Sequence, residues 1–206
     1  MKQRPIIGWI IMMLLCEICF AVDPMEERVA QLATALNIAT NAAAHISSRP
    51  VFTGENTIIA GEFQVRPKKI MEPHLGQPMD IDVLDTSGQG VAAGRVIEGT
   101  SFEVARSALL KRLVLNSMGM EALIQKYEVR DSDVGELCIV EKTFDNVNRK
   151  YTSDPAVIHF LRGGTAVSLY STAKGKDLWA IAKTLDSTMS EISGTGKPLS
   201  IPVAVP

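Results

Sequence analysis

The sequence predicts an α+β fold in which an antiparallel sheet of about four to six strands packs against two or three helices that cover mainly one side of it. Three observations support this prediction. Apolar residues recur at helical spacing in three segments, alternating β-branched segments are bounded by glycine-rich turns, and an apolar run with a basic start opens the chain. The expected organisation is a signal peptide over residues 1–21, a single α+β domain over residues 22–192 and a flexible Gly/Pro-rich tail over residues 193–206.

The start of the chain has the composition of a signal peptide. Lys2 and Arg4 form a short basic segment, residues 6–16 form an unbroken apolar stretch, and a more polar segment with small residues follows. Signal peptidase is therefore expected to cut between Ala21 and Val22. This places the mature protein outside the cytoplasm, in the periplasm or secreted, and a bacterial envelope is the natural setting.

An uncleaved membrane anchor is the alternative interpretation of this segment, because a spanning helix needs about 20 apolar residues and the segment is only slightly shorter. Glu17 disfavours the anchor, since a carboxylate inside the hydrocarbon is costly. The protein is therefore expected to contact the membrane only if this segment is retained.

Cleavage would change the meaning of the cysteines. Cys16 and Cys19 would leave with the signal peptide, and Cys138 alone cannot form an internal disulfide. The mature chain must then be held by an ordinary hydrophobic core. Cys138 lies in an apolar run and is expected to be a buried, inert thiol, with a nucleophile or an intermolecular disulfide as the alternatives.

Three segments are predicted to be helices. The first covers residues 24 to about 46, and the second covers residues 100–117 and opens with Thr100 as the start of a capping box. Residues 120–127 are expected to add one or two helical turns. The third helix begins at Asp177 and places five apolar residues at core spacing, with Trp179 beside that stripe. The five are Leu178, Ile181, Ala182, Leu185 and Met189.

Strands are predicted where β-branched residues alternate with polar ones. Residues 57–65 form the first strand, and residues 79–84 and 91–97 form a hairpin whose turn contains Asp85, a residue that bonds its own backbone. Residues 136–143 form a further strand, and a polar loop is expected to link it to the last hairpin.

The last hairpin is the clearest local structure in the sequence. Residues 156–162 and 165–171 alternate on either side of a Gly-Gly pair, which predicts a two-residue turn with Arg162 opposite Thr165. Counting back from this pair gives a core face and a mixed face. The core face carries Phe160 with Val167 and Ile158 with Leu169; the mixed face carries Val157 with Tyr170, His159 with Ser168 and Leu161 with Ala166.

Metal, cofactor and nucleic-acid functions have little support. The histidines, His45, His74 and His159, are widely separated, and no His or Cys pair has zinc-site spacing, so neither a metal nor a cofactor is expected. The formal net charge of −2 becomes −3 when Lys2, Arg4 and Glu17 are removed, which gives no basis for nucleic-acid binding.

Three acidic residues have part of a calcium-loop pattern, namely Asp80, Asp82 and Asp85. Leu84 stands where the third oxygen ligand should be, so the pattern fails. The chain also has no serine elbow and no glycine-rich phosphate loop, and no catalytic residue is assigned.

These observations favour an exported, non-catalytic domain that binds an unknown envelope or extracellular partner. The candidate binding residues are His159, Arg162 and Tyr170 on the last hairpin, and for each of them a plain structural role is the competing interpretation. One alternative is an extracytoplasmic hydrolase whose acid and base are carboxylates that the fold brings together. Another is a membrane-anchored assembly component, if the N-terminal segment is not cleaved.

Overall fold

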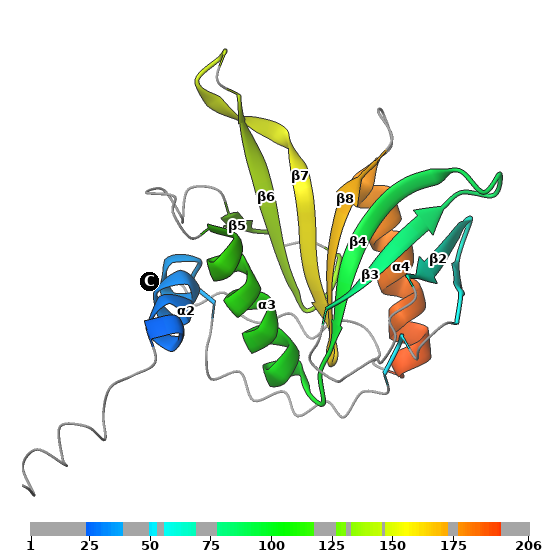
Figure 1. Ribbon diagram of the computed structural model, residues 1–206, viewed down its shortest axis with the longest axis horizontal. Coiled ribbons are helices and arrows are strands. Elements are labelled where there is room, and N and C mark those ends of the chain that lie inside the picture. The colour runs from blue at the N-terminus through cyan, green and yellow to red at the C-terminus, as the bar shows by residue number, and fades with distance from the viewer. Residues whose placement is uncertain are drawn as a thin grey trace, which may run out of the picture.

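The structure, a computed structural model, describes residues 24–38, 50–52, 56–68, 78–117, 127–130, 133–145, 147–172 and 177–194. In these residues eight strands form one sheet in the order β1-β2-β3-β4-β8-β7-β6-β5, and every neighbouring pair is antiparallel. The same residues include three helices, of which α3 and α4 pack on the sheet and α2 packs on α3 (Figure 1). The α+β class is confirmed, but the sheet is larger than the four to six strands expected.

The elements have the following bounds. The helices are α2 (Pro24–Ala35), α3 (Phe102–Ser117) and α4 (Leu178–Ser193). The strands are β1 (Ile58–Ala60), β2 (Phe63–Pro67), β3 (Pro78–Leu84), β4 (Gly90–Glu98), β5 (Tyr127–Val129), β6 (Leu137–Asp145), β7 (Lys150–Arg162) and β8 (Thr165–Ser171).

Two features make the sheet larger than expected. Gly61 has a φ of 55°, which suits a tight hairpin turn, and β1 pairs with β2 across it. The single strand predicted over residues 57–65 is therefore two strands. The second feature is β5, in which Tyr127 pairs with Glu141 of β6 although it was expected to end a helical segment.

Helices cover both faces of the sheet, which corrects the expectation that they would cover mainly one side. α4 joins one apolar core with side chains from β1 to β4 and from β6 to β8. α3, with α2 packed against it, covers part of the opposite face. The reason lies in the central strands, where successive apolar residues such as Phe160 and Leu161 are both buried, one on each face.

The first half of the sheet curls around α4. This helix contacts β1, the first strand in the order, and also β8 and β7, the fifth and sixth strands. Figure 1 shows β3 and β4 bending over it. Gly94 of β4 lies in this region. A Cβ at this position would overlap the Ser168 carbonyl oxygen and lie 2.9 Å from Leu169 Cδ2. Only glycine fits where β4 and β8 approach so closely.

The first helix ends earlier than predicted. Asn37 takes a left-handed φ of 53°, and the N–H groups of Asn37 and Ile38 donate to the carbonyl oxygens of Thr34 and Ala33 at 3.0 and 2.8 Å. This pair of bonds is a Schellman motif, which terminates a helix. α2 therefore stops well before residue 46, because asparagine adopts the left-handed conformation at little cost.

The other two helices begin and end close to the predicted residues. α3 is capped by Ser101, whose Oγ accepts from Val104 N at 3.3 Å, and not by Thr100 as expected. Asp177 caps α4 by accepting from the N–H groups of the second and third helical residues, and Gly194 ends the helix with a φ of 70°. All five residues predicted at core spacing in α4 are buried.

Both predicted hairpins form with the expected pairing. β3 pairs with β4, and Asp85 accepts from Ser87 N and Gln89 N at 2.9 and 3.1 Å in the turn between them. β7 pairs with β8 in the predicted register, from Arg162 opposite Thr165 to Val157 opposite Tyr170. The loop expected before Pro155 is instead largely strand, since β7 already begins at Lys150.

Several predictions fall outside the described residues. They are the signal peptide over residues 1–21 with its cleavage between Ala21 and Val22, the helical turns over residues 120–126, and the tail beyond residue 194. Within the described ranges, no helix has the length and apolarity needed to cross a membrane.

Gly94→Ala is expected to destabilise the protein by about 1 to 3 kcal/mol, because the methyl group has no room between β4 and β8. Urea unfolding followed by circular dichroism measures the change. Gly90→Ala in the same strand is the matched control, since a Cβ there would lie 4.0 Å from its nearest neighbour, Thr172 Oγ1. The control should change the free energy of unfolding by less than about 0.5 kcal/mol. Equal effects of the two substitutions would contradict the close approach of the strands.

Candidate functional site

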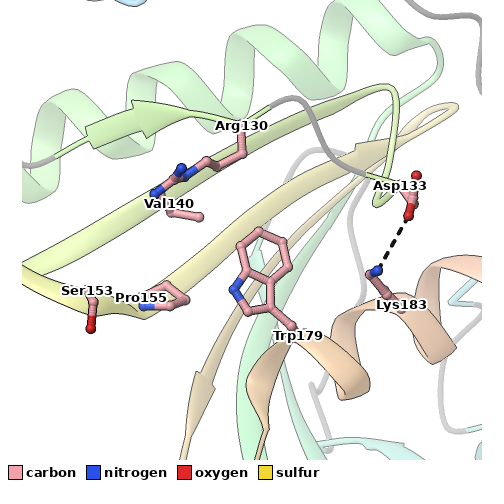
Figure 2. A pocket seen from close by; sticks show the side chains of 7 residues that line it. All are labelled: Arg130, Asp133, Val140, Ser153, Pro155, Trp179 and Lys183. Atoms are coloured by element: carbon pink, nitrogen blue, oxygen red, sulfur yellow. Dashed lines mark hydrogen bonds and ion pairs between the residues drawn. The ribbon is translucent and has the colours of Figure 1, made fainter.

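A groove lies between the first half of α4 and strands β6 and β7, on the face that α4 covers (Figure 2). Its volume is about 500 Å³, within the range of about 300–1,000 Å³ that small-molecule sites occupy. We call it the Trp179 groove. It is lined by Arg130, Asp133, Val140, Ser153, Pro155, Trp179 and Lys183.

The position of Trp179 follows from the apolar pattern of α4. Leu178, Ile181 and Leu185 point into the core and fix which face of the helix is buried. Trp179 lies beside this stripe, so it packs against the core while remaining only partly buried. Figure 2 shows its indole projecting from α4 toward Arg130 and Val140. The ring therefore forms one wall of the groove.

The opposite wall comes from β6 and β7. Val140 is 1% exposed and forms an apolar floor. Pro155 pairs with Lys142 at a shift in the β6–β7 register, where a residue without an N–H group is tolerated. Ser153, two residues earlier in β7, is exposed and adds a hydroxyl to the rim.

Among the residues that the structure describes, the two cations of the groove form exposed ion pairs. Arg130 Nη2 lies 3.1 Å from Glu128 Oε2, and the same oxygen lies 2.6 Å from Lys142 Nζ. The Lys142 ammonium, with a smaller contribution from Arg130, lowers the pKa of Glu128. Lys183 Nζ lies 3.4 Å from Asp133 Oδ2, and the Asp133 side chain is 91% exposed. Exposed pairs of this kind contribute little stability, so a bound anion can replace them.

The three residues predicted to bind a partner are not brought together. His159 and Tyr170 lie on the α3 face of the sheet, whereas Arg162 points to the α4 face. His159 and Arg162 are each 2% exposed, and Tyr170 is 46% exposed. None of the three lines the Trp179 groove.

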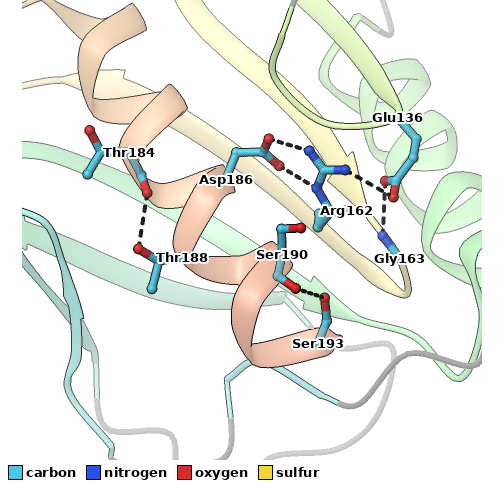
Figure 3. Close-up of polar contacts among 8 residues, drawn as sticks. All are labelled: Glu136, Arg162, Gly163, Thr184, Asp186, Thr188, Ser190 and Ser193. Atoms are coloured by element: carbon cyan, nitrogen blue, oxygen red, sulfur yellow. Dashed lines mark hydrogen bonds and ion pairs between the residues drawn. The ribbon is translucent and has the colours of Figure 1, made fainter. Parts of the chain in front are cut away.

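Arg162 belongs to a buried ionic network at the turn between β7 and β8 (Figure 3). Its Nε donates to Asp186 Oδ1 at 2.8 Å and its Nη2 pairs with Asp186 Oδ2, while Nη1 lies 3.3 Å from Glu136 Oε1. Glu136 Oε2 also accepts from Gly163 N at 3.0 Å. The network joins α4, the hairpin turn and the residue ahead of β6. Removing one partner from such a pair costs about 3 to 5 kcal/mol, which indicates a structural role for Arg162.

Burial and charge oppose each other within this network. Burial raises the pKa of Glu136, and the Arg162 guanidinium and the Gly163 N–H only partly offset it. Burial would lower the pKa of Arg162, but Asp186 and Glu136 outweigh that effect and the pKa is raised. The guanidinium is therefore charged, and its positive charge attracts the carboxylates of both Asp186 and Glu136.

His159 lies in a separate polar cluster on the α3 face. Its Nδ1 is 2.9 Å from Ser168 Oγ, its Nε2 is 3.9 Å from Glu141 Oε2, and Tyr127 packs edge-on at a centroid distance of 6.1 Å. The order serine, histidine, glutamate is that of a hydrolase triad, but the second distance is too long for a hydrogen bond. Ser168 is also only 7% exposed. This burial does not suit a nucleophile that must reach a substrate.

The acidic residues of the rejected calcium pattern each have a structural partner. Asp80 pairs with Arg95, Asp82 lies 3.1 Å from Lys68 Nζ, and Asp85 caps its own turn. Among the described residues, no three His, Cys, Asp or Glu side chains are grouped to hold a metal ion.

Cys138 is 2% exposed within the apolar core, which confirms the prediction of a buried thiol. Cys16, Cys19, His45 and His74 lie outside the described residues.

None of the lining residues was expected to form a site. One signal was available, because Trp179 is a large aromatic residue placed just off the buried stripe of an amphipathic helix. Arg130 and Asp133 gave no signal, since they follow a strand that the sequence pattern did not predict. Their approach to α4 depends on the strand order.

Comparison of the chain with protein-family models, with curated proteins and with solved structures finds no match. The functional argument therefore depends on the residues themselves.

His159 is expected to make stability depend on pH. Burial lowers its pKa below the usual 6.5, and Glu141 opposes this only in part. Above pH 6.5 the imidazole is neutral in both the folded and the unfolded chain. Below pH 6.5 the unfolded chain takes up a proton first, so the free energy of unfolding decreases as the pH falls, until the folded pKa is reached. From pH 7 to pH 5 the free energy of unfolding of the protein should decrease by about 1 kcal/mol more than that of the His159→Gln variant.

Urea unfolding at pH 7, 6 and 5 measures this difference. Ser168→Ala, which retains the imidazole, is the control and should keep the pH dependence. Parallel pH profiles for the protein and His159→Gln would show that the imidazole is not held neutral by burial. Comparing the two chains cancels the contributions of acids that both contain.

Proposed function

We propose that the protein is an exported, non-catalytic binding protein that takes its ligand in the Trp179 groove. The observation that carries this proposal is the composition of the groove. An indole, a proline ring and a buried valine adjoin two exposed cations in about 500 Å³. Binding sites for small molecules combine apolar walls with a few polar groups in this way.

The same composition favours binding over hydrolysis. Acid and base catalysis by carboxylates needs two of them close together, or a histidine beside one. The described residues that line the groove include a single carboxylate, Asp133, and no histidine. The pairing of His159 with Glu141 lies on the other face of the sheet.

Export is supported by the N-terminal sequence. The basic residues Lys2 and Arg4, the apolar run over residues 6–16 and the small residue Ala21 have the order of a cleaved signal peptide. The mature protein would then begin at Val22 and work in the periplasm or outside the cell. Its ligand or partner would be a component of the envelope or the medium.

Mass spectrometry of the protein recovered from the periplasm or medium of an expressing bacterium is expected to give a chain that begins at Val22. A full-length chain that stays in the membrane fraction would favour the anchored assembly component. A full-length chain that is soluble inside the cell would contradict export.

Ligand binding is tested through the indole N–H resonance of Trp179. The chain has two tryptophans, Trp9 and Trp179, so Trp9→Phe in the full chain leaves one reporter. At least one member of a panel of aromatic acids, alcohols and amines is expected to shift this resonance. Ser153→Phe should abolish the shift by filling the groove, and Thr143→Phe is the control because Thr143 is exposed outside it.

Two results would contradict the proposal. In one, no member of the panel shifts the Trp179 resonance. In the other, Ser153→Phe and Thr143→Phe bind equally well, which would place the binding site outside the groove.

A further inference from the structure

We infer that the ligand of the Trp179 groove is an organic acid, a molecule with one carboxylate and a flat apolar body. This inference rests on the proposed function and names the class of ligand.

The charge of the groove favours a single negative charge. Arg130 and Lys183 line it together with one acid, Asp133, which leaves an excess of one positive charge. A monoanion neutralises this excess. A dianion would place its second charge near Asp133 or Glu128, where it would be repelled.

Arg130 is suited to receive the carboxylate. Its side chain is 42% exposed and, in Figure 2, lies beside Val140 on the groove side of the strand. The planar fork of an arginine donates two parallel hydrogen bonds to a carboxylate. If the Arg130 guanidinium turned toward a ligand, Glu128 would keep its other partner. Lys142 Nζ lies 2.6 Å from Glu128 Oε2, closer than Arg130 Nη2 at 3.1 Å.

The apolar body of the ligand would lie against Trp179, Pro155 and Val140. The indole is only partly buried although it packs against the core of α4, so one part of the ring remains open to the groove. An aromatic ring stacks on such a surface more favourably than an open chain does. A flat ring with a short acidic arm would contact Trp179 and Arg130 together.

An organic amine is the opposite possibility, since tryptophan and aspartate attract cations. The groove disfavours it because both cationic side chains would repel an amine. Asp133 offsets this repulsion only in part, because it supplies one negative charge against two positive charges and is itself paired with Lys183.

The test uses three compounds with one skeleton and different charges, namely 4-phenylbutyrate, 4-phenylbutan-1-ol and 4-phenylbutylamine. Each is titrated into the full chain carrying Trp9→Phe, and the shift of the Trp179 indole N–H resonance gives its dissociation constant. The acid is expected to bind about tenfold more tightly than the alcohol, and the amine most weakly. Added salt should weaken the binding of the acid and leave the binding of the alcohol unchanged.

Arg130→Gln is expected to weaken the binding of the acid about tenfold without changing the affinity for the alcohol. Lys183→Gln provides a second variant from the other end of the groove and should weaken the acid by a smaller factor. Lys150→Gln is the matched control, because it removes one positive charge from β7 outside the groove. The affinity of the control for the acid should change by less than about twofold.

The possible failures are distinguishable. If the acid and alcohol bind equally, or if the amine binds most tightly, the inferred ligand class is wrong and the groove remains a binding site. If both Arg130→Gln and Lys183→Gln keep the preference for the acid, the carboxylate is not held by the groove cations and the inference is again wrong. If none of the compounds tested here or in the wider panel shifts Trp179, the proposed function fails as well.

Discussion

The side chain of Arg162 is 2% exposed, and both of the carboxylates that its guanidinium contacts belong to other parts of the fold. A buried charge of this kind must keep its partners, because losing one leaves an uncompensated ion away from water. Asp186 therefore has to face the turn between β7 and β8, which fixes the rotation of α4 about its own axis. Trp179 and Lys183 lie on the same helix within two turns of Asp186. The contact that positions the helix also positions one wall of the groove.

A partly buried acid, Glu98, likewise joins separate parts of the fold. Glu98, at the end of β4, accepts from Val51 N, Phe52 N and Thr165 Oγ1 at 3.2, 2.7 and 2.8 Å. Burial raises its pKa, although these three hydrogen bonds oppose the shift. A raised pKa gives stability that is present at low pH and is lost as the pH rises through the folded value, which is the reverse of the effect of His159. Glu98 and His159 therefore make opposite contributions to the pH dependence of stability.

Local patterns were sufficient to predict the elements but not their arrangement. The Gly-Gly turn gave the β7–β8 register, and the apolar stripe of α4 gave its five buried residues. The sequence does not mark Gly61 as a turn, because Ile58 and Ile59 before it and Phe63 and Val65 after it favour a strand. Both faces of the central strands are apolar, but a single sequence does not say which helix covers which face.

The candidate site was harder to predict for the same reason. His159 was placed correctly opposite Ser168, yet its burial depends on α3 and β5. Arg162 appeared to be a strand-end residue, and its two acids are distant in sequence, at positions 136 and 186. The groove joins residues from four separate stretches of the chain, 130–133, 140, 153–155 and 179–183. The spacing of residues along the sequence cannot predict this groove, because the strand order brings its residues together.

That strand order also determines what the sheet presents to other molecules. The outermost strands, β1 and β5, are the shortest of the eight, with three residues each. An open sheet edge exposes unpaired N–H and C=O groups that can pair with another extended chain. Within the described residues each outermost strand is therefore only three residues long, and a very short edge strand is one way in which proteins limit the pairing of a sheet edge with other chains.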